Sequence, residues 1–226
     1  MTKSRISTGF RALDGLLGGG LVPGSGYVFV SAPGLGKTTL LLQLLAAAAR
    51  VGHECLFASI EQTADDLASF VQRALGPESG VRLLGSDGDA YKLVEEAERT
   101  NAKVLALDSL QTAFVDDVQA DVGSAEQQKA VLNYLTSFAA ARNAVVLFVA
   151  HLDRDGQLSS DWRVEALANH LGGTTCRIEM PRCTCGAAEG LHHLRIVTAD
   201  RNKYGPPGRR AVLAMTEHGF SDGLLV

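Results

Sequence analysis

A glycine-containing turn in this 226-residue sequence carries the residue types that bind phosphate. Residues 31–38 read Ser-Ala-Pro-Gly-Leu-Gly-Lys-Thr and depart from the phosphate-loop pattern G-x(4)-G-K-[ST] only at the first residue, Ser31. Serine can make this turn if its φ stays negative. Gly34 and Gly36 let the backbone approach phosphate oxygens closely. The amides that follow lie at the start of an expected helix, where the helix dipole favours an anion.

The side chains of this loop predict a nucleotide bound together with a magnesium ion. Lys37 places a positive charge beside the β- and γ-phosphate oxygens of ATP, and the Thr38 hydroxyl is placed for Mg²⁺. A chance glycine turn would not require a strand before the loop and a helix after it, both of which the sequence predicts. The residues expected to contact the nucleotide are Ser31, Pro33, Gly34, Leu35, Gly36, Lys37, Thr38 and Thr39.

Three polar residues stand at the ends of apolar segments that read as strands. Asp108 ends VLALD, Glu61 ends ECLFASIE, and His151 ends VVLFVAH. We expect Asp108 on the Mg²⁺ side of the site, Glu61 as the acceptor of a proton from the attacking water, and His151 as a hydrogen-bonding sensor of the γ-phosphate. Each residue also has an alternative, structural role. Asp108 would cap the next turn, and Glu61 would suit the N-terminus of the following helix. His151 would donate a hydrogen bond to a loop carbonyl.

The elements that must position these groups alternate between strands and helices. The strands expected to carry them are apolar on both faces, as in a parallel sheet covered by helices on each side: 27–31, 54–60, 103–107 and 144–150. The helices expected between them are 38–51, 63–75, 89–100 and 126–142. Three further strands in close succession, at 174–180, 192–198 and 210–215, predict an antiparallel extension of the sheet edge. The fold class is therefore α/β with a mostly parallel central sheet.

Composition excludes several classes of protein. The chain is 46% hydrophobic with a net charge of −4, which fits a globular domain and excludes a polybasic nucleic-acid binder. The most apolar run, 40–49, is about half of the roughly 20 residues that a membrane span needs. Residues 1–9 have no apolar export signal, so we expect a cytoplasmic protein, not bound to membranes, whose four cysteines are reduced.

A cysteine pair near the end of the chain raises the question of zinc. Cys183 and Cys185, with His192 and His193, offer two thiols and two imidazoles. The spacing is tighter than the usual C-x(2–4)-C, and the residues lie between two expected strands. A surface hairpin is the alternative, and whether these residues bind zinc stays open.

The segments 5–14 and 17–25, together with the loop at 31–38, resemble the opening of the RecA-like P-loop ATPases. Within these, the sequence resembles the ATPase core of the bacterial RadA (Sms) family over nearly its whole length, and the KaiC-like ATPases share much of the opening. Glu61, Asp108 and His151 fall at the positions of the family's catalytic glutamate, Walker B aspartate and sensor. The resemblance implies one RecA-like ATPase domain over residues 1–226. We expect this domain alone, without the zinc module that precedes it and the protease-like domain that follows it in full-length members.

The segment Arg201-Asn-Lys-Tyr-Gly205 resembles the motif Lys-Asn-Arg-Phe-Gly that marks the RadA family. The resemblance implies that Arg201 and Lys203 act at a subunit boundary and reach ATP bound by a neighbour, in a homo-oligomer that is a ring, such as a hexamer, or a filament. Residues two apart on a strand share a face, so both cations suit one phosphate group. The alternative is a basic edge strand that resists aggregation.

The resemblance implies an ATP-dependent motor on single-stranded DNA in recombination, repair or replication. The loops that would line its channel, 111–124 and 152–166, are poor in cations: the first has none, and the second has Arg154 and Arg163 among four acids. Trp162 suits either stacking on a base or a subunit contact. The acidic loops favour the alternative, a KaiC-like regulatory ATPase that acts on protein partners. A nucleotide-binding module without turnover is a third class, which Glu61 and Asp108 argue against.

Overall fold

A nine-stranded sheet forms the centre of the computed structural model, which describes residues 4–76, 79–85, 88–153, 156–158, 162–181 and 191–223. The strand order is β3-β2-β4-β5-β1-β6-β7-β8-β9. The first six strands in this order run parallel, and β7, β8 and β9 are antiparallel to their neighbours. The strands are β1 (Ser25–Ser31), β2 (Cys55–Ser59), β3 (Val81–Gly85), β4 (Val104–Asp108), β5 (Val145–His151), β6 (Thr174–Glu179), β7 (Leu194–Arg201), β8 (Arg210–Thr216) and β9 (Gly219–Ser221).

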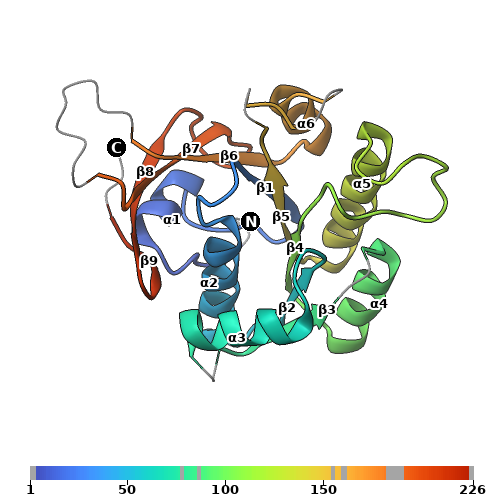
Figure 1. Ribbon diagram of the computed structural model, residues 1–226, viewed down its shortest axis with the longest axis horizontal. Helices are drawn as coiled ribbons and strands as arrows, with labels where there is room; N and C mark the ends of the chain where they lie inside the picture. The colour runs from blue at the N-terminus through green and yellow to red at the C-terminus, as the bar shows by residue number, and fades with distance from the viewer. Residues whose placement is uncertain are drawn as a thin grey trace.

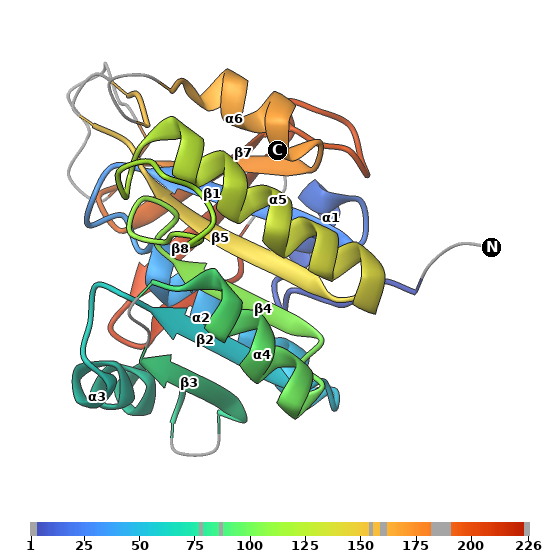
Figure 2. The same cartoon turned by 90° about the vertical axis from the view of Figure 1, so that its right-hand side faces the viewer.

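Helices cover both faces of the sheet. Figure 1 shows α1, α2 and α3 on one side of the sheet and α4, α5 and α6 on the other. Figure 2 views the second side, with α4, α5 and α6 in front of the strands. The helices are α1 (Arg11–Leu17), α2 (Lys37–Arg50), α3 (Ala64–Leu75), α4 (Ala90–Thr100), α5 (Ala125–Arg142) and α6 (Val164–Leu171). Among the described residues, no helix combines the length and the apolar character that a membrane crossing requires.

Alternate residues of each central strand enter two separate cores. In β1, Tyr27 and Phe29 pack with α1, α2 and α3, while Val28 and Val30 pack with α4, α5 and α6. Every residue of β1, β2 and β4 is buried. Two buried faces explain why these strands read as continuous apolar runs, and they confirm the expected α/β architecture.

Three of the predicted helices begin within one residue of their expected starts: α3 and α4 begin one residue later, at Ala64 and Ala90, and α5 begins one residue earlier, at Ala125. The side chains of Thr63, Asp89 and Ser124 accept hydrogen bonds from backbone amides in the first turns of α3, α4 and α5. Each of these residues lies just outside its helix and satisfies an amide that has no partner within the helix.

Four elements of the structure and one strand pairing differ from the sequence-based expectation. The elements that were not expected are α1, α6, β3 and β9. α1 and α6 have only 7 and 8 residues, β9 has 3, and β3 is a half-exposed edge strand, so their hydrophobic periodicity is weak. β6 pairs in parallel with β1. The antiparallel extension therefore begins only at β7.

The C-terminal hairpin of β8 and β9 packs against the start of α2. The side-chain amide of Gln43 accepts a hydrogen bond from the Phe220 amide at 2.8 Å and donates to the Phe220 carbonyl at 3.0 Å. A Cβ at Gly36 would lie 2.2 Å from Met215 Cε, so the phosphate loop and the hairpin touch directly. The antiparallel extension thus supports the loop from one side.

Candidate active site

The candidate site lies at the carboxyl edge of the parallel strands. Ser31 ends β1, Asp108 ends β4, His151 ends β5, and Glu61 follows β2. The order β2-β4-β5-β1 makes these strands neighbours, so their ends meet at one edge of the sheet. This is where open α/β sheets bind ligands, and the structure brings the predicted residues together there.

The phosphate loop has the backbone that its glycines permit. Gly34 and Gly36 have φ values of +77° and +91°, in the left-handed region that favours glycine. Gly36 is the N-cap of α2, which begins at Lys37. The amides at the start of α2 are therefore available to an anion.

The ammonium of Lys37 is buried and folded back on the loop. Its Nζ donates to the Ser31 carbonyl at 2.9 Å, to Ser31 Oγ at 2.9 Å and to the Ala32 carbonyl at 3.0 Å, and the residue is 4% exposed. Burial lowers the pKa of Lys37 to about 8, while the carboxylates of Asp108 and Glu61 oppose this shift. Ser31, the one departure from the loop pattern, thus holds the lysine through both its backbone and its hydroxyl.

Asp108 and Thr38 form the part of the site that suits a magnesium ion. Thr38 Oγ1 donates to Asp108 Oδ2 at 2.5 Å. Burial raises the pKa of Asp108 above its usual value, and the hydrogen bond from Thr38 offsets only part of this rise. The second oxygen, Oδ1, is buried and has no hydrogen-bond partner among the described residues. The Thr38 hydroxyl and the Asp108 carboxylate, with its unpartnered Oδ1, offer hard oxygen donors. These residues therefore fit Mg²⁺.

Glu61 and His151 contact each other beside Asp108. His151 Nε2 lies 3.0 Å from Glu61 Oε1, and one ligand atom of each of these three residues lies within 4.8 Å of the others. Glu61 keeps 41% of its side chain exposed, which leaves it access to water. The arrangement holds a solvent-accessible carboxylate next to an imidazole and a buried acid.

Two further residues of the site received no role from the sequence. Ser109 Oγ donates to Glu61 Oε1 at 2.8 Å. The side chain of Gln111 bonds both backbone groups of His151, donating to its carbonyl at 3.0 Å and accepting from its amide at 3.3 Å. Both residues belong to the stretch Asp108-Ser-Leu-Gln-Thr112, which was the one signal in the sequence that could have found them.

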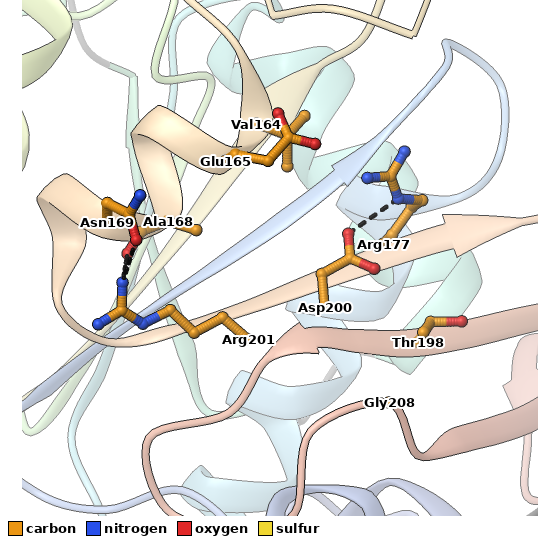
Figure 3. Close-up of a pocket in the computed structure, with 9 residues that line it drawn as sticks. All are labelled: Val164, Glu165, Ala168, Asn169, Arg177, Thr198, Asp200, Arg201 and Gly208. Atoms are coloured by element: carbon orange, nitrogen blue, oxygen red, sulfur yellow. Dashed lines mark hydrogen bonds and ion pairs between the residues drawn. The ribbon is translucent and has the colours of Figure 1, made fainter.

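Arg201 and Lys203 do not join this constellation within the chain. Arg201 pairs with Thr175, which pairs with Val28, and the chain then continues away from the Ser31 end of β1. Arg201 Nη1 donates to the Ala168 carbonyl at 3.0 Å and to Asn169 Oδ1 at 2.8 Å, at the end of α6 (Figure 3). The guanidinium borders a cavity of about 710 Å³ between α6 and the strands β6 and β7.

The residues between and after these two cations anchor the segment to α1, to β1 and to Arg5. Asn202 Nδ2 donates to the Leu16 carbonyl at 2.9 Å, and Tyr204 OH accepts from Ser25 Oγ at 2.6 Å. The Tyr204 carbonyl also accepts from Arg5 at 3.1 Å. Lys203 is exposed, with its Nζ 5.6 Å from the centre of the Tyr204 ring. Alternate residues of the segment therefore bind the protein's own core, while Lys203 faces solvent.

Both uses predicted for Trp162 are wrong in this chain. Trp162 is 3% exposed and packs in the core under α5 and α6, with its ring 5.9 Å from that of His170. Its large apolar surface is already buried, so it is not available to a base or a neighbouring subunit. Arg163 is exposed, whereas Arg154 lies outside the described residues.

Two of the four residues considered as zinc ligands lie outside the described residues, so the question of a zinc site stays open. Cys183 and Cys185 lie outside them, while His192 and His193 face each other with ring centres 5.9 Å apart. The two described cysteines, Cys55 and Cys176, are buried, and burial raises the pKa of both thiols.

The chain is similar in sequence and in fold to known proteins. Residues 2–157 match the family described as "AAA domain". The chain is 31% identical over 218 residues to the DNA repair protein RadA of Escherichia coli (strain K12), a match that covers 96% of this chain and 44% of the relative. It is 30% identical to the DNA repair protein RadA of Aquifex aeolicus (strain VF5), covering 96% and 46%. The chain therefore spans less than half the length of these relatives.

Among solved structures, a KaiC-like protein of the hyperthermophilic archaeon Pyrococcus horikoshii OT3 has a similar fold. The TM-score is 0.73 at 15% sequence identity, and the match covers 100% of both chains. At this identity the likeness concerns the fold alone.

Proposed function

Because the chain belongs to the AAA domain family and is a RecA-like ATPase that resembles the RadA core, we propose that it binds ATP with Mg²⁺ and hydrolyses it at the loop of residues 31–38. One observation carries this proposal. Thr38 and Asp108 meet at 2.5 Å beneath the phosphate loop, with Glu61 and His151 beside them. A module that binds nucleotide without turnover would not need Glu61 and His151 beside the metal-binding pair.

Each residue of the site has a task in this reaction. Lys37 leaves its carbonyl partners and binds the β- and γ-phosphate oxygens, while the amides of α2 hold the phosphates by hydrogen bonds. Thr38 and Asp108 would hold Mg²⁺, which would supply charge neutralisation at the phosphates. Glu61 orients the attacking water and accepts its proton, and His151 donates a hydrogen bond that reports the γ-phosphate.

The second part of the proposal concerns assembly. Arg201 and Lys203 lie away from the chain's own phosphate loop, so the nucleotide they would serve is that of a neighbouring copy, for which Arg201 exchanges its contacts with Ala168 and Asn169. A cation supplied in trans stabilises the charge that develops on the γ-phosphate. We propose a ring or filament with heterologous contacts, in which each active site is shared by two subunits.

The third part concerns the partner. The relatives named DNA repair protein RadA support action on single-stranded DNA in recombination, repair or replication. A specific observation favours the second candidate, a KaiC-like regulatory ATPase that acts on protein. The exposed Asp116 and Asp117 lie in the loop after β4, and Gln127 fixes that loop by bonds to the carbonyls of Val115 and Val118. A fixed acidic loop repels a phosphate backbone.

The test is the ATPase rate with and without single-stranded DNA at two salt concentrations, with an acidic polypeptide as the polyanion control. If DNA is the partner, DNA alone raises the rate, and the effect falls with salt because cation–phosphate contacts release counterions. A rate that DNA does not change assigns the second candidate. The absence of ATP hydrolysis under all conditions would refute both.

A further inference from the structure

The segment that follows β4 contacts polar residues at the carboxyl ends of both neighbouring strands. β4 lies between β2 and β5 in the sheet. From its end, Ser109 reaches Glu61, which follows β2, and Gln111 reaches His151, which ends β5. Both contacts join residues far apart in sequence, by 48 and 40 positions. One short segment therefore holds the two polar groups that flank Asp108.

We propose that Ser109 and Gln111 are positioning residues that fix Glu61 and His151 in the geometry needed for hydrolysis. The inference rests on the proposed ATPase function and deepens it. Ser109 acts through Glu61, and Gln111 acts through His151. Neither side chain touches the nucleotide in this scheme.

Ser109 determines which oxygen of Glu61 is free. Its hydroxyl donates to Oε1 at 2.8 Å, and His151 Nε2 lies 3.0 Å from the same oxygen. With two polar neighbours on Oε1, the carboxylate cannot rotate without losing both contacts, and Oε2 is the oxygen left to take a proton from water. Ser109 is 0% exposed, so no solvent molecule replaces its hydroxyl without rearrangement of the core.

Gln111 fixes the backbone position of His151 at the end of β5. Its amide group pairs with the backbone amide and carbonyl of His151, as another strand would. On the other side of His151, the amide of the next residue, Leu152, donates to the Ser31 carbonyl. That carbonyl also accepts from Lys37. The histidine is thus held between the phosphate loop and the segment after β4.

The first experiment compares Ser109→Ala with Ser59→Ala. Ser59 is a matched control because it pairs with Asp108 in the sheet and is 1% exposed, and its hydroxyl has no hydrogen-bond partner among the described residues. We expect Ser109→Ala to lower kcat by about 10- to 100-fold with KM and the ATP Kd within about twofold, because a small misplacement of a reacting group has this effect. Ser59→Ala should keep the kcat of the unmodified chain. Equal kcat values in both variants, or a change confined to KM, would overturn the assignment.

A double-substitution cycle tests whether Ser109 acts through Glu61. In a Glu61→Gln background, Ser109→Ala should lower the residual rate by less than about twofold, because the group that it positions no longer accepts a proton. A full additional loss in that background would show that Ser109 serves the fold or the metal ligand Asp108 instead.

Two measurements without ATP separate this inference from the ATPase proposal. A crystal structure of Ser109→Ala should show Glu61 Oε1 moved away from His151 Nε2. Hydrogen exchange should be at least tenfold faster at the His151 amide in Gln111→Met than in the unmodified chain, because that amide loses its acceptor. An unmoved Glu61 and an unchanged exchange rate would overturn the inference even if the chain hydrolyses ATP. If both changes are seen in a chain that hydrolyses no ATP, they would support the positioning role of Ser109 and Gln111 while the ATPase proposal fails.

Discussion

Replacing Lys37 by methionine should make the nucleotide-free protein more stable while it abolishes ATP binding. The reason lies in the burial of the ammonium, which lowers the pKa of Lys37 from 10.5 to about 8. At neutral pH the folded chain therefore keeps a charge where burial disfavours it. A lowering of about 2.5 units corresponds to roughly 3 kcal/mol, at 1.36 kcal/mol per unit.

The contacts that Lys37 leaves behind limit the gain but do not reverse it. The Ser31 carbonyl still accepts from the Leu152 amide at 3.0 Å, and the Ala32 carbonyl still accepts from Ser31 Oγ at 2.8 Å. No backbone acceptor is left without a donor, so the loss of three hydrogen bonds to lysine removes only part of the gain. We expect a net increase of about 1–2 kcal/mol in the free energy of unfolding, or roughly 2–8 °C in Tm for a chain of this size.

The pH dependence gives the sign of the effect. The folded-state pKa of Lys37 lies below its unfolded value, so its destabilising contribution is full below pH 8 and fades as pH rises toward 10.5. The stability gap between Lys37→Met and the unmodified chain should therefore narrow between about pH 7 and pH 10. Urea unfolding at these pH values measures it, with Lys103→Met as a control whose amine donates to the Arg142 carbonyl at 3.4 Å, its one hydrogen bond among the described residues. A less stable Lys37→Met, or a gap that does not change with pH, would refute this account of the loop.

Three further predictions concern catalysis. Glu61→Gln should keep ATP binding and lose about 10²- to 10⁴-fold in kcat, because the amide cannot accept a proton; isothermal titration and a phosphate-release assay measure the two quantities. Asp108→Asn should instead weaken Mg²⁺ binding, so that the same assay needs a higher Mg²⁺ concentration for half-maximal rate; the reverse pattern would show that the two acids were assigned in the wrong order. Lys37→Ala and the double variant Arg201→Ala/Lys203→Ala should each be inactive alone but regain partial activity when mixed, since some interfaces then pair an intact loop with an intact basic pair; no recovery would remove the cations from the neighbour's site.

The site was predictable wherever its chemistry is local in the sequence. The residues of the phosphate loop are contiguous, and Glu61, Asp108 and His151 each end an apolar run that reads as a buried strand. Parallel strands of one sheet present their ends at the same edge, so the meeting of these side chains follows from the pattern alone. The roles proposed for them stay predictions.

The C-terminal quarter was harder to predict because its short elements have weak patterns. β7 continues to Arg201, beyond the expected end at 198, so part of the basic segment belongs to the strand. Trp162 looked like a surface aromatic in a loop, yet it is buried under α5 and α6. Part of the apolar surface that covers this side chain belongs to α6, a helix that the sequence did not predict.

The sequence by itself determined the fold class, the phosphate loop and the strand-end residues, because periodicity and short motifs depend on neighbours along the chain. Tertiary structure alone decided that β4 lies between β2 and β5, and with this order it decided that Ser109 contacts Glu61 and Gln111 contacts His151. It also placed the guanidinium of Arg201 against α6, away from the chain's own phosphate loop. Strand order and register depend on which faces bury each other, and that is a property of the whole packed core, with no counterpart in any local stretch of sequence.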